Sequence, residues 1–244
     1  IYFYQAKAAS IFLWKFDRKL AGYLLSNSWP LAFSAVLVTV YMKIDQLMVE
    51  DYLGINAIGI YSTVVPLSES WYFIPVAIVT SVFPAIMNAK RDDPERYIKR
   101  LQNMYDLMAW VSIFIAIVMT FLSPLIYRFF YDEAYYEGAH VLAVHVWAGV
   151  FVFLGSASGQ YLIAEGYTKL SLMRTAVGAA INIVLNMLWI PQYGIIGAAY
   201  ATLIAYFAAT FFVLIIPKTR SQGFMMLRSL FLVTAVQKIF KSKS

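Results

Sequence analysis

Long apolar stretches follow one another along the chain, separated by short polar segments. Six of them are long enough to cross a membrane, because a bilayer core needs about 20 largely apolar residues in a helix. All but the first are apolar nearly all round, as helices embedded in lipid are. They cover residues 29–49, 61–87, 107–127, 141–164, 172–190 and 195–216. The pattern predicts an all-α membrane protein, a six-helix transmembrane bundle.

Composition agrees with this prediction. The 244 residues are 61% hydrophobic and 13% charged, against about 45–50% and about 25% in ordinary globular domains. A water-soluble protein of this size cannot bury so much apolar side chain. These values disfavour a soluble enzyme, a nucleic-acid module and a disordered scaffold. The chain has no cysteine, which excludes a disulfide framework and thiolate chemistry.

The positive charges gather on one side of the predicted bundle. Of the 19 Lys and Arg residues, all but Lys43 and Arg128 fall in segments 1–28, 88–106, 165–174 and 217–244. Six consecutive spans place these four segments on the same side. Short cytoplasmic loops are rich in Lys and Arg, so we expect both termini to be cytoplasmic. The net charge of +6 therefore indicates orientation in the membrane and not nucleic-acid binding.

The ends of the chain differ from the central part, and we divide it into three segments. Residues 1–28 are expected to be the tail of an upstream span and a cytoplasmic amphipathic connector. Residues 29–217 are the bundle, and residues 218–244 a cytoplasmic basic amphipathic tail. In this tail an interfacial helix is favoured over a seventh span, because Arg228 and Lys238 interrupt a short apolar run. The start at Ile1, without a signal-peptide pattern, suggests a piece of a longer protein.

Three ionisable residues lie within predicted spans, where such residues are costly and indicate function. Lys43 and Asp45 lie near the outer end of the first span. Lys43 either extends to the interface, pairs with a carboxylate on another helix or has a role in transport. Asp45 is too short to reach the interface, so we expect it to face a wet cavity. Glu69 lies about 12 Å into the second span, at 1.5 Å per residue.

The second span also carries three prolines at intervals of nine, Pro66, Pro75 and Pro84. Proline removes a helix hydrogen bond, so we expect this helix to bend more than once. Irregular backbone within a membrane is tolerated where it is buried or lines a cavity, and transporters place substrate sites at broken helices. Trp71 and Tyr72 could stack on sugars there or simply pack.

The fifth span places Asn182 and Asn186 on one helix face, four residues apart. Interhelical hydrogen bonding is the ordinary interpretation, and a cavity wall is the alternative. The sequence presents no assembled catalytic set, metal-ligand group or phosphate-binding loop. We therefore expect neither an enzyme nor a resident cofactor.

Three strings of residues carry a resemblance to a known family. They are SWPLAFSAVLVTVYMKIDQLMVEDYLG (28–54), IGIYSTVVPLSESWYFIPVAIVTSVFPAI (58–86) and QYGIIGAAYATLIAY (192–206). They resemble the second half of bacterial polysaccharide-export flippases, which move lipid-linked oligosaccharides and belong to the multidrug/oligosaccharidyl-lipid/polysaccharide (MOP) exporter superfamily. Such MATE-like transporters have twelve helices in two six-helix bundles. The resemblance implies that this chain is the C-terminal bundle and that the N-terminal six-helix half is missing.

The resemblance also implies a function. Members of the family flip undecaprenyl-diphosphate-linked oligosaccharide repeat units across the bacterial inner membrane for O-antigen, capsule or exopolysaccharide synthesis. Rocking of the two bundles around a cavity moves the substrate, and a coupling proton or sodium ion resets the protein. Lys43 is then a candidate ligand of the polyprenyl diphosphate, and Asp45 and Glu69 are candidate coupling or cavity acids. The glycan lipid and membrane lipids are the expected partners.

Three alternatives remain open. A multidrug or lipid II exporter of the same superfamily would have the same fold. A polyprenyl-glycan membrane enzyme would need a large outer loop with catalytic residues, whereas the longest here is about 128–140. A scaffold without transport activity is the third alternative.

The predicted orientation can be tested with single cysteines, since the chain has none of its own. A cysteine placed within 88–106 should react with an impermeant thiol reagent only after the cells are opened. A cysteine placed within 128–140 should react in intact cells. Labelling of the 88–106 position from outside would overturn the topology.

Overall fold

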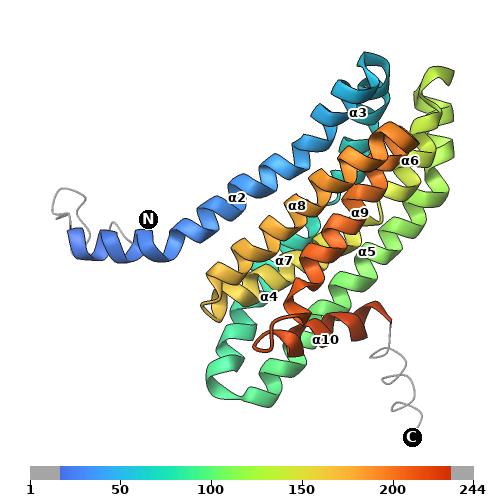
Figure 1. The fold of residues 1–244 in the computed structure, drawn as a ribbon. Helices are drawn as coiled ribbons and strands as arrows, with labels where there is room; N and C mark the ends of the chain where they lie inside the picture. The colour runs from blue at the N-terminus through green and yellow to red at the C-terminus, as the bar shows by residue number, and fades with distance from the viewer. Residues whose placement is uncertain (1–16, 232–244) are drawn as a thin grey trace, which may run out of the picture.

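The structure, a computed structural model, describes residues 17–231, and this part contains helices and no β-strand. Figure 1 shows long helices running side by side, with one short helix across an end. The elements are α2 (Arg18–Leu53), α3 (Ile55–Glu69), α4 (Phe73–Asp92), α5 (Pro94–Phe130), η2 (Glu133–Tyr135), α6 (Glu137–His145), α7 (Ala148–Ala164), α8 (Thr168–Tyr193), α9 (Ile195–Phe211), η3 (Phe212–Leu214) and α10 (Arg220–Leu230).

Six stretches of this structure are long and apolar enough to cross a membrane. Four are formed mainly by α2, α5, α8 and α9, while α3 with α4 and α6 with α7 form the other two. The spans are Ser28–Leu53, Ile55–Asp92, Pro94–Phe130, Glu133–Ala164, Thr168–Tyr193 and Ile195–Leu214. The predicted six-helix transmembrane bundle is confirmed.

The first span begins as part of a longer helix than the sequence predicts. Helix α2 starts at Arg18, where the Asp17 carboxylate accepts hydrogen bonds from the backbone N–H groups of Lys19 (2.8 Å) and Leu20 (3.2 Å). The described part of the predicted connector is thus continuous with the span. Pro30 lies inside α2, where it cannot donate a helix hydrogen bond. Figure 1 shows the first turns of α2 bending away from the bundle. The remainder of the connector, residues 1–16, lies outside the described residues.

Two spans are interrupted within the membrane. The second breaks between α3 and α4, in the proline-rich region. The fourth breaks between α6 and α7, which the sequence did not predict, since no proline lies there. At the break between α6 and α7, the Trp147 N–H donates to the carbonyl of Val144 and no longer to that of Ala143. The Ala143 carbonyl accepts a hydrogen bond from the Thr120 hydroxyl of α5 instead (3.3 Å). A neighbouring helix therefore satisfies the carbonyl that the break exposes, as the bilayer requires.

Single glycines connect two of the antiparallel helix pairs. Gly54 (φ 81°) joins α2 to α3, and Gly194 (φ 72°) joins α8 to α9. A left-handed backbone at a helix end favours glycine. In the first turn of α9, a Cβ on Gly197 would lie 2.4 Å from the carbonyl oxygen of Trp189 in α8. The two backbones thus approach too closely for a side chain, as small residues permit in membrane helix pairs.

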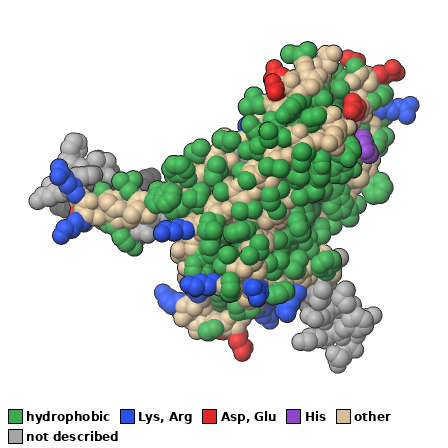
Figure 2. Space-filling model, in the orientation of Figure 1, with side chains coloured by type: hydrophobic (Ala, Val, Ile, Leu, Met, Phe, Trp, Pro, Cys, Tyr) green, Lys and Arg blue, Asp and Glu red, His purple; other side chains and the backbone are tan. Residues whose placement is uncertain are grey.

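The surface of the bundle is apolar between two charged ends. Large apolar side chains point outward along the shaft, such as Phe114, Phe121 and Leu125 on α5. Figure 2 shows Lys and Arg mostly at the lower end and Asp and Glu mostly at the upper end. We name these the basic end and the acidic end; α10 lies at the basic end. An apolar shaft with charge concentrated at its ends fits a bilayer.

Helix α10 lies across the basic end and belongs to the folded bundle. With 11 residues it is about 17 Å long at 1.5 Å per residue, too short for a span. Its buried face includes Gln222, Met225, Met226 and Ser229. The predicted tail therefore begins as a docked helix, and residues 232–244 lie outside the described residues.

Candidate functional site

One buried carboxylate connects three helices inside the bundle. Asp45 of α2 is 4% exposed. Its Oδ1 accepts a hydrogen bond from Asn186 Nδ2 of α8 (2.6 Å), and its Oδ2 accepts one from the Thr202 hydroxyl of α9. A buried carboxylate is costly unless it is paired or hydrogen-bonded. These donors explain how Asp45 is accommodated, and the structure places it in the packed interior and not at an open cavity wall.

Two further side chains complete this group, which we call the Asp45 cluster: Asp45, Tyr61, Asn182, Asn186 and Thr202. Asn186 Nδ2 also bonds to Asn182 Oδ1 (3.3 Å). The Tyr61 hydroxyl of α3 lies beside the Asp45 carboxylate. The structure thus brings together three predicted site residues, Asp45, Asn182 and Asn186. The hydrophobic pattern gave no signal for Tyr61 and Thr202, since their role depends on which helices meet.

The Asp45 cluster has hydrogen-bonding capacity that the described protein does not use. Within residues 17–231, Asn186 Oδ1 is buried without a hydrogen-bond partner, while the Tyr61 hydroxyl and Asn182 Nδ2 lie close to the Asp45 carboxylate without forming a hydrogen bond of good geometry. Buried polar atoms are nearly always paired with protein, water or an ion. These atoms lie around one carboxylate with Asn, Thr and Tyr oxygens, the donor type that hard cations prefer.

Lys43 and Glu69 lie outside the Asp45 cluster. Lys43, two residues before Asp45, is exposed, and Glu69 is half-buried as the last residue of α3. Glu69 lies within electrostatic range of both Lys43 and Asp45. The three predicted charged residues therefore lie near one another on α2 and α3. Asp45 is inside the bundle, and Lys43 is on its surface.

The break in the second span follows directly from one proline. Residues 70–72 form a turn between α3 and α4. Pro75 has no N–H to donate to the Trp71 carbonyl, which instead accepts from the Ile74 N–H (3.0 Å). Pro66 lies inside α3 and Pro84 inside α4, and neither ends its helix.

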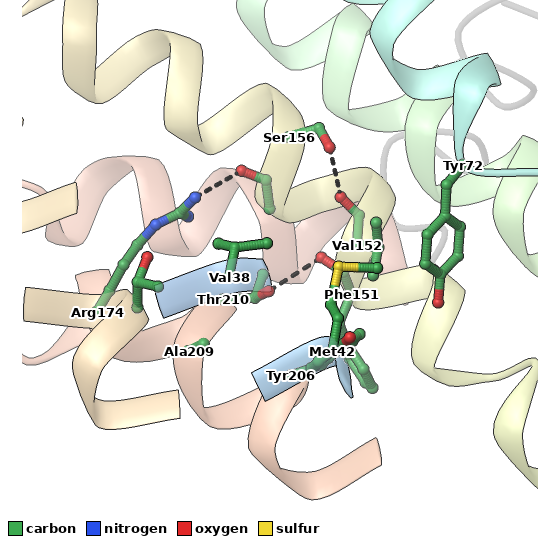
Figure 3. A pocket seen from close by; sticks show the side chains of 12 residues that line it. Val38, Met42, Tyr72, Phe151, Val152, Ser156, Arg174, Tyr206, Ala209 and Thr210 are labelled. Atoms are coloured by element: carbon green, nitrogen blue, oxygen red, sulfur yellow. Dashed lines mark hydrogen bonds between the residues drawn. The ribbon is translucent and has the colours of Figure 1, made fainter. Parts of the chain in front are cut away.

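The two aromatic residues at this break have different surroundings. Trp71 packs against the buried cluster around Tyr61 and Leu142. Tyr72 lines a cavity of about 200 Å³ between α2, α7, α8 and α9. Figure 3 shows this cavity with Tyr72 on one side and Arg174 on the other. Of the two predicted sugar-stacking candidates, only Tyr72 lines this space.

Arg174 differs from the other cation of the segment 165–174, because it also lies within the fifth predicted span. In the structure it belongs to α8 and is half-buried beside α7. Its guanidinium donates to the Gly155 carbonyl (2.8 Å) and to the Ser158 hydroxyl (3.1 Å). A Cβ on Gly159 would lie 3.2 Å from this guanidinium. The small residues of α7 therefore make room for Arg174.

Comparison with solved structures identifies the fold. The fold matches the MATE transporter VcmN of Vibrio cholerae with a TM-score of 0.67 and 21% identity, over 92% of this chain and 57% of VcmN. It matches the lipid II flippase MurJ with a TM-score of 0.63 and 20% identity, over 93% of this chain and 50% of MurJ. The six-helix bundle is thus the fold of half a MOP-superfamily transporter.

Sequence comparison shows the family. Residues 30–188 match the family model described as MatE, and the chain belongs to that family of membrane transporters. Among its relatives is the capsular polysaccharide biosynthesis protein CapF of Staphylococcus aureus, 23% identical over 184 residues, which are 74% of this chain and 46% of CapF. The chain spans less than half the length of the curated relatives that it matches.

The charge of the Asp45 cluster can be tested with two matched substitutions in α9. Thr202 donates to a carboxylate, whereas Thr210 donates to the Phe151 carbonyl (3.0 Å), and both are buried. Hydrogen bonds to charged groups contribute about 1.5–3 kcal/mol and neutral ones about 0.5–1.5 kcal/mol. Thr202→Val should therefore lower the free energy of unfolding in detergent more than Thr210→Val. Equal losses would show that Asp45 is not held as a charged group.

Proposed function

We propose that this bundle is half of an ion-coupled exporter that moves polyprenyl-diphosphate-linked oligosaccharides across the bacterial cytoplasmic membrane. The observation that carries the proposal is the Asp45 cluster, a single buried carboxylate held by donors from α8 and α9. An ionisable group inside a membrane is expensive, and in transporters it marks ion and proton pathways. Membership of the MatE family supports the transport function.

The coupling ion is proposed to bind at Asp45. Apart from the amide nitrogens, the polar atoms around the site are oxygens. They belong to the carboxylate, to the side chains of Asn182 and Asn186, and to the two hydroxyls of the Asp45 cluster. A site with one carboxylate suits a singly charged ion, either a sodium ion or a proton. Among the described residues, no group of three or more His, Asp or Glu side chains forms a metal site.

Ion binding would change how α2 is held. Hydrogen bonds that end on an ionised carboxylate are roughly twice as strong as neutral ones. When a proton or sodium ion neutralises Asp45, the bonds from Asn186 and Thr202 weaken, and α2 is released from α8 and α9. When the ion leaves, the charged carboxylate draws the three helices together again. This exchange gives the bundle two states that an ion gradient can bias.

The substrate class is supported by weaker observations. The strings around Lys43, Asp45 and Glu69 resemble polysaccharide-export flippases, and one relative is a capsular polysaccharide biosynthesis protein. Lys43 is exposed on α2 next to the Asp45 neighbourhood, where it can bind a diphosphate. The cavity with Tyr72 could accept part of a sugar. We further propose that a second six-helix bundle faces this one, because the fold covers 57% of VcmN and 50% of MurJ.

Asp45→Asn tests the coupling. The amide has the shape of the carboxylate but neither the charge nor the titratable proton, so glycan export should fall at least about tenfold with unchanged protein abundance. Export is measured by complementation, and in vesicles under a sodium gradient or a pH gradient, which identifies the ion. Asp51→Asn, the same change at an exposed position of the same helix, is the matched control. Normal export by the Asp45 variant would remove this residue from the mechanism.

Lys43→Ala tests the substrate. Loss of one ammonium–phosphate contact should weaken binding of polyprenyl diphosphate about tenfold, since charge-assisted bonds are strong. Lys43→Arg keeps the charge and should retain most of the binding. A multidrug exporter that takes cationic compounds would respond in the opposite direction, with tighter binding in the Ala variant. Unchanged diphosphate binding would mean that Lys43 only extends to the membrane interface.

A further inference from the structure

A broad groove separates the start of α5 from α10 at the basic end of the bundle. Its volume is about 1010 Å³. One wall is a single face of α5 with Ile98 and Lys99, and the other is α10 with Arg220, Phe224 and Arg228. All five side chains are exposed. The groove thus combines apolar walls with a rim of three cations.

The groove is a fixed part of the fold, because hydrogen bonds hold α10 to α5. Gln102 Nε2 donates to the Met225 carbonyl (3.1 Å) and to the Ser229 hydroxyl (2.8 Å), and Ser229 donates to Asp106 (2.8 Å). Asp106 is buried in this contact. Among the residues that line the groove, Glu95 is then the one exposed acid facing three cations. The net charge of the groove is positive and attracts an anion.

The groove continues a surface that faces the hydrocarbon of the membrane. Beyond Asp106 the same side of α5 carries Trp110, Phe114, Ile117 and Phe121, spaced three or four residues apart and all exposed. Tryptophan is enriched where hydrocarbon meets the polar head groups. A chain lying along these side chains would place its polar end at the groove.

A second space at the C-terminal end of α10 is apolar. It has a volume of about 470 Å³ and is lined by Ile113, Phe207, Leu230 and Phe231, among others. A space of this kind between α5, α9 and α10 can take an acyl chain. The last turn of α10 thus contacts an apolar space, and its first turns border the basic groove.

We propose that the groove between α5 and α10 binds the head group of an anionic phospholipid, with its acyl chains along α5. The cationic rim suits the anionic head group of such a lipid, and the apolar walls suit its acyl chains. A free phosphate ion would contact the cationic rim alone. Residues 232–244 are a poor occupant, since Lys238, Lys241 and Lys243 would be repelled by the rim. The site does not depend on what the transporter carries.

Lipid binding to the purified full-length protein in detergent tests this site. Native mass spectrometry counts bound phosphatidylglycerol and phosphatidylcholine of equal chain length, each added in a concentration series. The groove variant is Lys99→Gln with Arg220→Gln and Arg228→Gln. The control variant is Arg91→Gln with Arg96→Gln and Lys169→Gln, exposed cations of the same end outside the groove. Removal of residues 232–244 gives a third variant.

The expected result is preferential binding of phosphatidylglycerol, weakened at least about tenfold in the groove variant and little changed in the control. An equal loss in both variants would show attraction to general surface charge and would overturn the site. Unchanged binding in the groove variant would do the same. Binding that requires removal of residues 232–244 would identify the tail as the occupant of the groove and would also overturn the proposal.

Discussion

The hydrogen bonds that Asn186 and Thr202 donate to Asp45 hold α2 against α8 and α9. In a bilayer no water is at hand to replace them, so these three helices must meet wherever Asp45 is ionised. Apolar packing alone would leave α2 free to slide or rotate, since lipid competes equally for its surface. The hydrogen bonds to this carboxylate therefore favour one register of α2 against α8 and α9.

Backbone N–H and C=O groups inside the membrane also need hydrogen-bond partners from the protein. Both interrupted spans lose helix hydrogen bonds inside the membrane, and each recovers them locally. At residues 70–72 the Trp71 carbonyl accepts from Ile74, and between α6 and α7 the Ala143 carbonyl accepts from Thr120. The break between α6 and α7 lies against α5, whose Thr120 hydroxyl partners the freed carbonyl. At the break between α3 and α4, Ser70 is exposed, and its hydroxyl donates to the Leu67 carbonyl of its own helix.

The sequence predicted the number and the approximate positions of the spans, because a helix that crosses a bilayer needs about 20 largely apolar residues. It did not predict their bounds: the third span covers Pro94–Phe130, against 107–127 expected from the apolar pattern. It also identified Asp45, Asn182 and Asn186, since polar groups stand out within those stretches. It did not predict that Asp45 is buried against Asn186 and Thr202, because periodicity describes one helix and not its partner. The sequence did not predict the acceptors of Arg174 either, because the Gly155 carbonyl and the Ser158 hydroxyl belong to α7. The docking of α10 depends on Gln102 and Ser229, which no apolar pattern marks.

The distance between Pro30 and Asp45 along α2 determines how far the N-terminal part of this helix moves when the Asp45 contact changes. Asp45 and Pro30 are separated by about 22 Å along α2, at 1.5 Å per residue. A tilt of about 10° around the Asp45 contact would move the Pro30 end by about 4 Å over this length. The projecting first turns of α2 would move with it. A small rotation of α2 about the Asp45 contact would thus produce a larger displacement at the N-terminal end of this helix.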